Sequence, residues 1–232
     1  MREPIILREY QKTDQKALEN VVREAWKYDF FCSPKTAAKM AEVYLNSCLA
    51  NQTFTRVAEI DGVPAGIIMG KDIQNHKCPL ALRIRWLKSV VSLYISKEGR
   101  EISKIFECIQ GIDKELLSSC SKDYRGELAF FAVSGKYRGR GLGRKLFQTV
   151  VDYMQSKGIS EFYLFTDTSC NYPFYEHLGL TRRCEKKQAI EVKGEKSNMT
   201  FFIYDCQTGE KEEKTRTVPP VSKSQDTACM SE

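Results

Sequence analysis

The sequence predicts an α/β fold, and three observations carry this prediction. Residues 127–133, ELAFFAV, form a short apolar and aromatic run that is typical of a strand. A glycine-rich basic loop follows, and behind it apolar residues recur at intervals of three and four, as on one face of a helix. Two alternating segments, residues 54–60 and 63–69, flank Asp61-Gly62, which is typical of a hairpin turn.

The N-terminal region predicts one strand and then two helices. Residues 4–8 contain three consecutive aliphatic side chains and are expected to form the first strand. Thr13 is placed to cap the first helix. Ser33-Pro34 combines an N-cap serine with a proline in the first turn, so a second helix should begin there and reach Leu49.

Residues 71–125 form a long connection with room for two helices. In the first, one apolar face is expected, opposite three basic residues: Leu82, Trp86, Val90 and Leu93 against Arg83, Arg85 and Lys88. In the second, the apolar residues are Ile102, Ile105, Phe106, Ile109, Leu116 and Leu117. Two interpretations stay open, namely helices that pack on the sheet with a solvated basic side, or an insertion that shapes a binding pocket or a subunit contact.

The C-terminal part predicts three more strands. Residues 159–166, with FYLF at the centre, form the first of them. Residues 184–192 and 199–204 are expected to form an antiparallel pair around a turn at Lys193-Gly194.

Length and composition indicate a globular protein with one domain. The 232 residues are 42% hydrophobic and 28% charged, which is ordinary for such a domain. We expect this domain over residues 1–206 and a disordered polar tail over 207–232. The net charge of +6 is modest: it suits a ligand with several phosphates and does not by itself indicate nucleic acid.

The nine cysteines are spread along the chain without a CxxC pair, and the start MREPIILREY turns polar at once. We therefore expect no signal peptide, reduced thiols and a cytoplasmic location. No apolar run is long enough to cross a membrane, so no membrane partner is expected. Two histidines and scattered cysteines predict no metal site.

The basic loop is suited to binding an anion. Gly139, Gly141 and Gly143 let the backbone approach phosphate oxygens closely, and the N–H groups that begin the following helix face the same place. The loop is not a P-loop, because Gly143 is followed by Arg144-Lys145 rather than Lys-Ser/Thr. A dinucleotide site needs GxGxxG where this chain has GxGxG, and it stays a weaker alternative with Asp167 as the ribose-binding acid.

Two motifs stand in order along the chain. The first is Arg138-x-x-Gly141-x-Gly143 between a strand and an amphipathic helix, and the second is NYPFYEHLGL over residues 171–180. Together they resemble the GNAT family, the Gcn5-related N-acetyltransferases, whose second motif reads FYEKLGF. The resemblance covers most of the chain up to about Cys206. It implies a mixed, twisted, mainly antiparallel sheet flanked by helices, with residues 71–125 as a helical insertion between the third and fourth strands.

The resemblance also implies an enzyme that takes acetyl-coenzyme A as co-substrate and transfers the acetyl group directly to a primary amine. The backbone of Phe131, Ala132 and Val133 would pair with the pantetheine arm. The other implied cofactor contacts are Arg138, Gly139, Arg140, Gly141, Leu142, Gly143, Arg144 and Asn171. Asn171 departs from the family pattern, because it stands four residues before the motif tyrosine rather than about seven, and Pro173 interrupts the interval.

For catalysis, the resemblance implies that Tyr175 protonates the departing thiolate, because a phenol of pKa about 10 is protonated at neutral pH. An N–H of Ala132 or Val133 would polarise the thioester carbonyl. The general base is left open between Glu127, another carboxylate such as Glu59, and an ordered water.

The acceptor cannot be read from the sequence. In the family the region between the first two helices borders the acceptor site, so Tyr28 and Phe31, together with Glu59, are candidate acceptor contacts. A small-molecule amine and a peptide both stay open, as does a homodimer. A non-catalytic coenzyme A sensor is the alternative from another class. A nucleic-acid binder is disfavoured, because aromatic and basic residues do not interleave on the predicted strands.

Overall fold

The computed structural model describes residues 4–192 and 195–209. Within them lies a seven-stranded sheet in the order β1-β2-β3-β4-β5-β7-β6, in which β4 and β5 are parallel and the other neighbours antiparallel. The strands are β1 Ile6–Arg8, β2 Phe54–Ile60, β3 Val63–Asp72, β4 Gly126–Val133, β5 Glu161–Asp167, β6 Thr181–Val192 and β7 Glu195–Gln207. The predicted mixed, mainly antiparallel sheet is confirmed.

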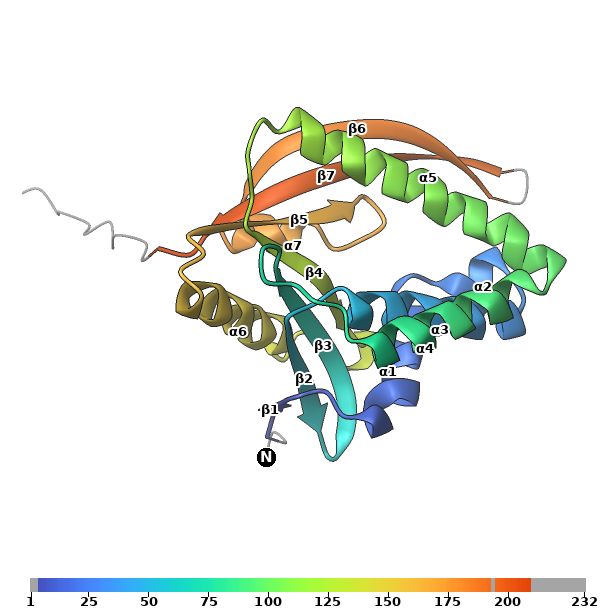
Figure 1. The fold of residues 1–232 in the computed structure, drawn as a ribbon, viewed down its shortest axis with the longest axis horizontal. Coiled ribbons are helices and arrows are strands. Elements are labelled where there is room, and N and C mark those ends of the chain that lie inside the picture. Colours follow the sequence, from blue (N-terminus) through green and yellow to red (C-terminus); the bar gives the residue numbers. More distant parts are fainter. Residues whose placement is uncertain (1–3, 193–194, 210–232) are drawn as a thin grey trace, which may run out of the picture.

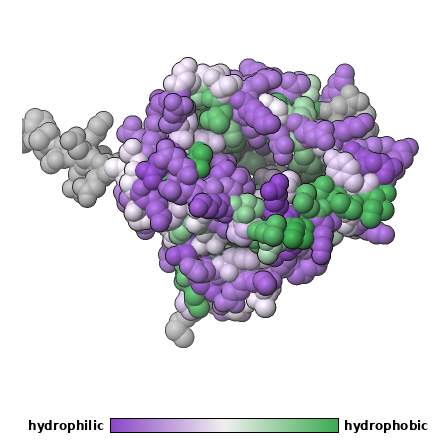
Figure 2. Space-filling model, viewed as in Figure 1, coloured by the Kyte–Doolittle hydropathy of each residue, from purple (hydrophilic) through white to green (hydrophobic). Residues whose placement is uncertain are grey.

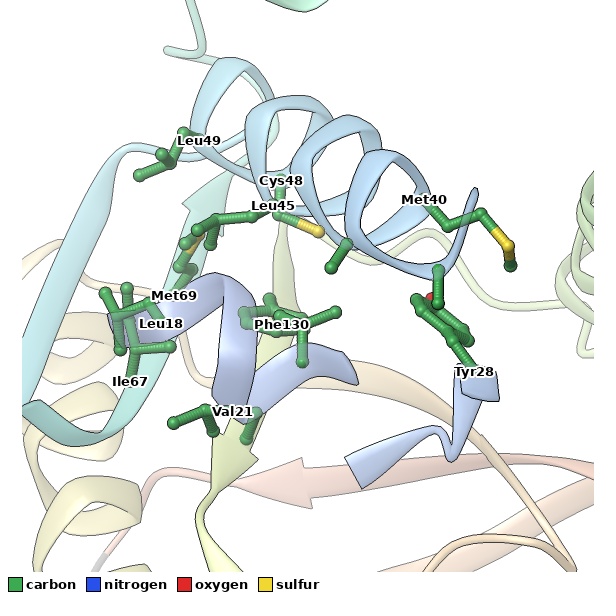
Figure 3. Close-up of a cluster of buried hydrophobic side chains, with 14 of the residues drawn as sticks. Leu18, Val21, Tyr28, Met40, Leu45, Cys48, Leu49, Ile67, Met69 and Phe130 are labelled. Carbon is green, nitrogen blue, oxygen red and sulfur yellow. The ribbon is translucent and has the colours of Figure 1, made fainter. Parts of the chain in front are cut away.

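Helices cover both faces of this sheet (Figure 1). They are α1 Gln15–Ala25, α2 Tyr28–Phe31, α3 Pro34–Ala50, α4 Leu80–Tyr94, α5 Lys97–Ser119, α6 Leu142–Ser156 and α7 Pro173–His177, with short 3-10 turns η1 Lys12–Asp14 and η2 Gly135–Tyr137. Helices α1 and α3 pack on one face, where Phe130 of β4 points up between them (Figure 3). Helix α6 and the short α7 pack on the other face, against Leu128 and Phe162.

The first helix begins differently from the prediction. Thr13 lies inside the turn η1 and does not cap α1. The carboxylate of Asp14 instead accepts the Gln11 N–H at 2.8 Å and the Arg8 guanidinium at 2.7 Å, so an ion pair fixes this entry. The second prediction is confirmed: the Ser33 hydroxyl accepts the Thr36 N–H at 3.4 Å at the start of α3.

The long connection forms two helices, as predicted. Helix α5 crosses the same face of the sheet as α1 and α3. Near its start, Ile102 joins the cluster under α3. Toward its end, Ile112 and Leu116 pack on Tyr163 of β5 and on β7. The insertion is also bound to α3, because Glu98 accepts the N–H of Ser33 at 2.8 Å. Residues 71–125 are therefore an integral part of this face.

Helix α4 shows a feature that the predicted apolar and basic faces did not include. Leu93 of the expected face is buried, but a second apolar stripe is exposed to solvent and forms the apolar patch in Figure 2: Leu80, Ile84, Leu87, Val91 and Ile95. None of the described helices combines the length and the apolar character that a membrane span requires.

The last strand of the sheet ends close to the predicted domain boundary at residue 206. Strand β7 runs through Gln207, and Thr208 is buried, with its hydroxyl donating to the carbonyl of Ile159 at 2.7 Å. The predicted Lys193-Gly194 turn lies outside the described residues, as do residues 210–232 of the tail predicted over 207–232.

Candidate functional site

The sheet opens between its two parallel strands. Strands β4 and β5 pair only at Gly126 with Phe162 and at Glu127 with Tyr163. Farther along, β5 continues to pair with β7, and β4 continues to pair with β3 as far as Val133. The edge of β4 that faces β5 is therefore left without a strand partner from Leu128 onward, which gives an extended ligand a place to add its own hydrogen bonds.

The start of helix α6 lies just beyond this open edge. Gly141 is the N-cap with φ +76°, a left-handed conformation that disfavours any residue with a Cβ. The first helical bond runs from the Lys145 N–H to the Gly141 carbonyl at 3.1 Å. The N–H groups of Leu142, Gly143 and Arg144 therefore have no helical acceptor and are available to an anion.

Gly143 leaves room for a neighbouring aromatic ring. A Cβ at this position would lie 3.3 Å from the ring of Phe174. That ring belongs to α7 and packs against Phe131 of β4, with centroids 5.7 Å apart. Gly143 thus lets the two sequence motifs meet beside the open strand edge.

The predicted basic residues flank the same helix start: Arg138 and Arg140 precede the N-cap, and Arg144 lies in the first turn of α6. Arg138 and Arg144 are exposed, and the Arg140 guanidinium lies 5.8 Å from the centre of the Tyr137 ring. Gly139 carries a positive φ of +75° in the same loop. Asn171 is exposed just before α7, and its backbone carbonyl accepts the Phe174 N–H at 3.2 Å.

Tyr175 lies on α7 at the side of the opening. Its ring packs against Phe174 and Tyr204, at centroid distances of 5.4 and 6.1 Å. Burial raises the pKa of its phenol above the ordinary value of 10.0, and the Cys170 thiol adds to this effect. The hydroxyl is therefore protonated at neutral pH, as a proton donor requires.

Glu127 lies at the closed end of the opening. Its carboxylate is 3.7 Å from the Lys71 ammonium, and Tyr163 is its register partner on β5. Burial raises the pKa of Glu127 above its ordinary value, although Lys71 and Tyr163 act in the opposite direction. A carboxyl of raised pKa is a better proton acceptor when ionised.

A bulge in β4 lies two residues beyond Glu127, and the sequence pattern did not reveal it. Met69 pairs with Phe130 and Gly70 with Leu128, so Ala129 has no partner on β3. The bulge redirects the backbone between Glu127 and the predicted pantetheine contacts at 131–133.

The three candidate acceptor contacts are placed differently. Tyr28 is 2% exposed and its ring lies beneath α3 near Met40 (Figure 3), while its hydroxyl has no hydrogen-bond partner among the described residues. Phe31 is half-buried at the edge of the same cluster. Glu59 is not part of this site: it lies on β2, two strands from β4, and its carboxylate accepts from Arg8 at 2.7 Å.

Two acidic residues border the opening in roles that the sequence did not suggest. Asp167 ends β5 and accepts the Ser169 N–H at 2.7 Å. Asp113 lies on α5, one turn after Ile109 and one turn before Leu116 of its inward apolar face. The sequence did contain a signal for Asp113, because a charged residue stands there among the inward-facing apolar positions of the helix. Among the described residues, no group of three or more His, Cys, Asp and Glu is arranged to hold a metal ion.

A sheet opened between parallel strands, with a free helix N-terminus and arginines at its end, defines a protein that binds an extended ligand carrying phosphates. The sequence profile of the Acetyltransferase (GNAT) family matches residues 18–180, and the chain belongs to this family. It is an acetyl-CoA-dependent acetyltransferase.

One curated relative is N-alpha-acetyltransferase 30 of Schizosaccharomyces pombe, 40% identical over 60 residues that make up 25% of this chain and 40% of that protein. Among solved structures, the ribosomal-protein-S18-alanine N-acetyltransferase of Escherichia coli is similar, with a TM-score of 0.53, 14% identity, and coverage of 91% of this chain and 98% of that one. An N-acetyltransferase from Staphylococcus aureus Mu50 gives a TM-score of 0.54, 11% identity, and coverage of 89% and 99%. At these identities the structures show a shared fold.

Proposed function

We propose that this enzyme transfers the acetyl group of acetyl-CoA directly to a primary amine on a small molecule or a peptide. The observation that carries the proposal is the continuity of the site. The unpaired edge of β4 leads from Glu127 to the free N-terminus of α6, and Tyr175 stands at its side. The short match to N-alpha-acetyltransferase 30 keeps a peptide α-amine among the acceptors.

The residues present fit the cofactor. The N–H groups of Leu142, Gly143 and Arg144 would hold the pyrophosphate, with charge supplied by Arg138, Arg140 and Arg144. The open backbone over residues 131–133 would pair with the amides of the pantetheine arm. Acetyl-CoA supplies the activated acetyl group as a thioester. Asn171 is exposed before α7, and a direct contact with the cofactor is a prediction for it as well.

We assign three roles in the reaction to this chain: two proton transfers and the stabilisation of one negative charge. Glu127, directly or through water, accepts the proton of the attacking amine. A main-chain N–H on the open edge of β4, predicted at Ala132 or Val133, stabilises negative charge on the carbonyl oxygen. Tyr175 gives its proton to the departing thiolate, and burial keeps that proton in place at neutral pH.

The experiment combines product analysis with steady-state kinetics. Purified protein is incubated with acetyl-CoA and matched primary amines, alcohols and thiols, and mass spectrometry identifies the acetylated products. We expect acetylation of amines alone, with intersecting double-reciprocal plots because both substrates must be bound together. Parallel plots together with an acetylated enzyme would contradict direct transfer, and acetylated alcohols or thiols would contradict the amine acceptor.

A further inference from the structure

Helix α4 carries an apolar stripe on its solvent side. Five aliphatic residues follow one line along the helix, and each is between 44% and 74% exposed: Leu80, Ile84, Leu87, Val91 and Ile95. Figure 2 shows them as the apolar patch along the helix that Figure 1 labels α4. Single exposed aliphatic side chains are ordinary on a protein surface, but a contiguous row of them marks an interaction surface.

The opposite side of α4 holds the helix in place. Leu93 is 2% exposed and belongs to the same core cluster as the buried residues of α3, and Ser89 is buried as well. The Lys39 ammonium of α3 donates to the carbonyl of Ser92 at 2.6 Å. The helix is therefore anchored without the stripe, and polar substitutions in the stripe should leave the fold intact.

Positive charge flanks the stripe. The segment from residue 73 to residue 97 contains five basic residues and no Asp or Glu: Lys77, Arg83, Arg85, Lys88 and Lys97. Arg83 and Lys88 are exposed, and at about 3.6 residues per turn they lie on opposite sides of the stripe. At the C-terminal end the Arg100 guanidinium donates to the carbonyl of Tyr94 at 2.8 Å, and the Tyr94 hydroxyl donates to Glu107 at 3.1 Å. A partner that fits this surface is apolar at its centre and negative along its sides.

We propose that the apolar stripe of α4 binds the surface of a membrane that contains anionic lipid, with the helix lying in the plane of the headgroups. The aliphatic side chains enter the upper part of the acyl chains, and lipid phosphates pair with Arg83 and Lys88. Leu and Val are under-represented among the residues that dominate protein–protein contacts, so the composition of the stripe favours lipid over a protein partner. A symmetric contact with a second copy would bring two basic surfaces together.

This kind of attachment differs from the one that the sequence excluded. We expected no membrane partner because no apolar run is long enough to cross a bilayer. A helix that lies on one leaflet makes no such demand, because only one of its faces enters the lipid. The inner face of α4 stays packed on the protein, so attachment needs no unfolding and is independent of the acetyl transfer proposed above.

The test is co-sedimentation of the purified protein with vesicles of phosphatidylcholine alone or of equal parts phosphatidylcholine and phosphatidylglycerol. We expect the wild type to bind the anionic vesicles at least about tenfold more tightly than the neutral ones, and added salt to weaken this binding. Leu87→Gln should lower the affinity for anionic vesicles about tenfold. Val63→Gln on β3 is the matched control, because both residues are 48% exposed, and it should bind like the wild type. Val91→Gln, at a residue 64% exposed, repeats the test at a second position of the stripe.

A second pair of variants separates the charges beside the stripe from the net charge of the chain. Arg83→Gln combined with Lys88→Gln should lower the affinity for anionic vesicles about tenfold. Lys187→Gln combined with Lys196→Gln removes the same net charge from exposed positions on β6 and β7, and it should retain the binding. Equal losses for the two pairs would overturn the assignment to α4.

Thermal unfolding checks that each variant keeps the fold, and we expect melting temperatures near that of the wild type. A wild type that does not sediment with anionic vesicles would overturn the proposal, as would Leu87→Gln and Val91→Gln variants that sediment equally well. Analytical ultracentrifugation tests the other occupant. A wild-type dimer that Leu87→Gln converts to a monomer would assign the stripe to a second copy of the chain and overturn the proposal.

Discussion

Glu127 and Tyr163 form the last register pair between β4 and β5. On one side of this pair the two strands belong to one continuous sheet, and on the other side they separate. The pair places a half-buried carboxylate at the closed end of the opening, where burial raises its pKa and Lys71 of β3 lowers it. The proposed cofactor and acceptor regions meet at this point.

Glu127→Gln tests the proposed base. We expect kcat/KM at neutral pH to fall about 100-fold, a magnitude typical for loss of a general base. In the wild type the rate should fall as the pH drops through the pKa of Glu127, which lies above its ordinary value of 4.5. The variant should lack this acidic limb. An unchanged pH–rate profile would remove Glu127 from the mechanism.

Glu59→Gln is the matched control for that experiment. Glu59 is held by Arg8 on the far part of the sheet, so the variant should keep its acetylation rate. It should instead lower the free energy of unfolding by about 1–2 kcal/mol, because a charge-assisted hydrogen bond is lost. Chemical denaturation measures this loss, and a fall in kcat with unchanged stability would return Glu59 to the active site.

Tyr175→Phe separates proton donation from packing. The ring keeps its contacts with Phe174 and Tyr204, so acetyl-CoA affinity and melting temperature should stay near wild type. We expect kcat to fall about 100-fold for an amine acceptor. Tyr172→Phe, in the same segment and with its ring 5.0 Å from that of Phe202, should keep full turnover. Equal rates for the two variants would contradict the assignment.

Asp113→Asn should stabilise the protein in a pH-dependent way. The folded-state pKa of about 7 is above the ordinary value of 3.8, so the ionised form is disfavoured by folding. The penalty is absent below pH 3.8, grows as the pH rises toward 7, and is complete above it. Burial is the largest cause of this raised pKa, and the negative charges of Asp167 and Glu127 add to it.

The measurement is thermal unfolding of both proteins. At pH values above the pKa of Asp113, we expect the variant to melt about 5 °C higher, which corresponds to roughly 2 kcal/mol for a domain of this size. The difference should disappear in acid below the ordinary pKa of aspartate. A variant less stable than wild type at all pH values would show that Asp113 has a stabilising partner.

Local patterns predicted most of the fold. The strand, loop and helix over residues 127–157 follow from an apolar run, glycines and a helical period, and these signals need no knowledge of neighbours. The pairing of β4 with β5 at only two positions depends on the whole sheet. The residues did not indicate it, and the family resemblance pointed to it only by assigning the backbone of residues 131–133 to the pantetheine arm. The prediction that Thr13 caps the first helix was wrong. The ion pair between Arg8 and Asp14 fixes the start of this helix instead, and a reading of the helix residues alone does not include Arg8.

The site was predicted less completely for a similar reason. The register of β2 shifts between Ala58 and Glu59, and a bulge of this kind changes which way later side chains point. Simple alternation therefore could not locate Glu59. Asp113 is inward only because α5 packs over β5 through Ile112 and Leu116, a contact between segments far apart in the sequence.

The most direct test of the central claim is calorimetric titration with acetyl-CoA of the wild type, Gly141→Ala and Gly62→Ala. Both glycines have a positive φ, +76° and +74°, and neither position has an atom within 4 Å of an added Cβ, so the backbone strain is matched. Only Gly141 begins α6. We predict that Gly141→Ala loses at least about tenfold in affinity while Gly62→Ala binds like the wild type. Equal binding by all three proteins would contradict the placement of the cofactor pyrophosphate at the N-terminus of α6.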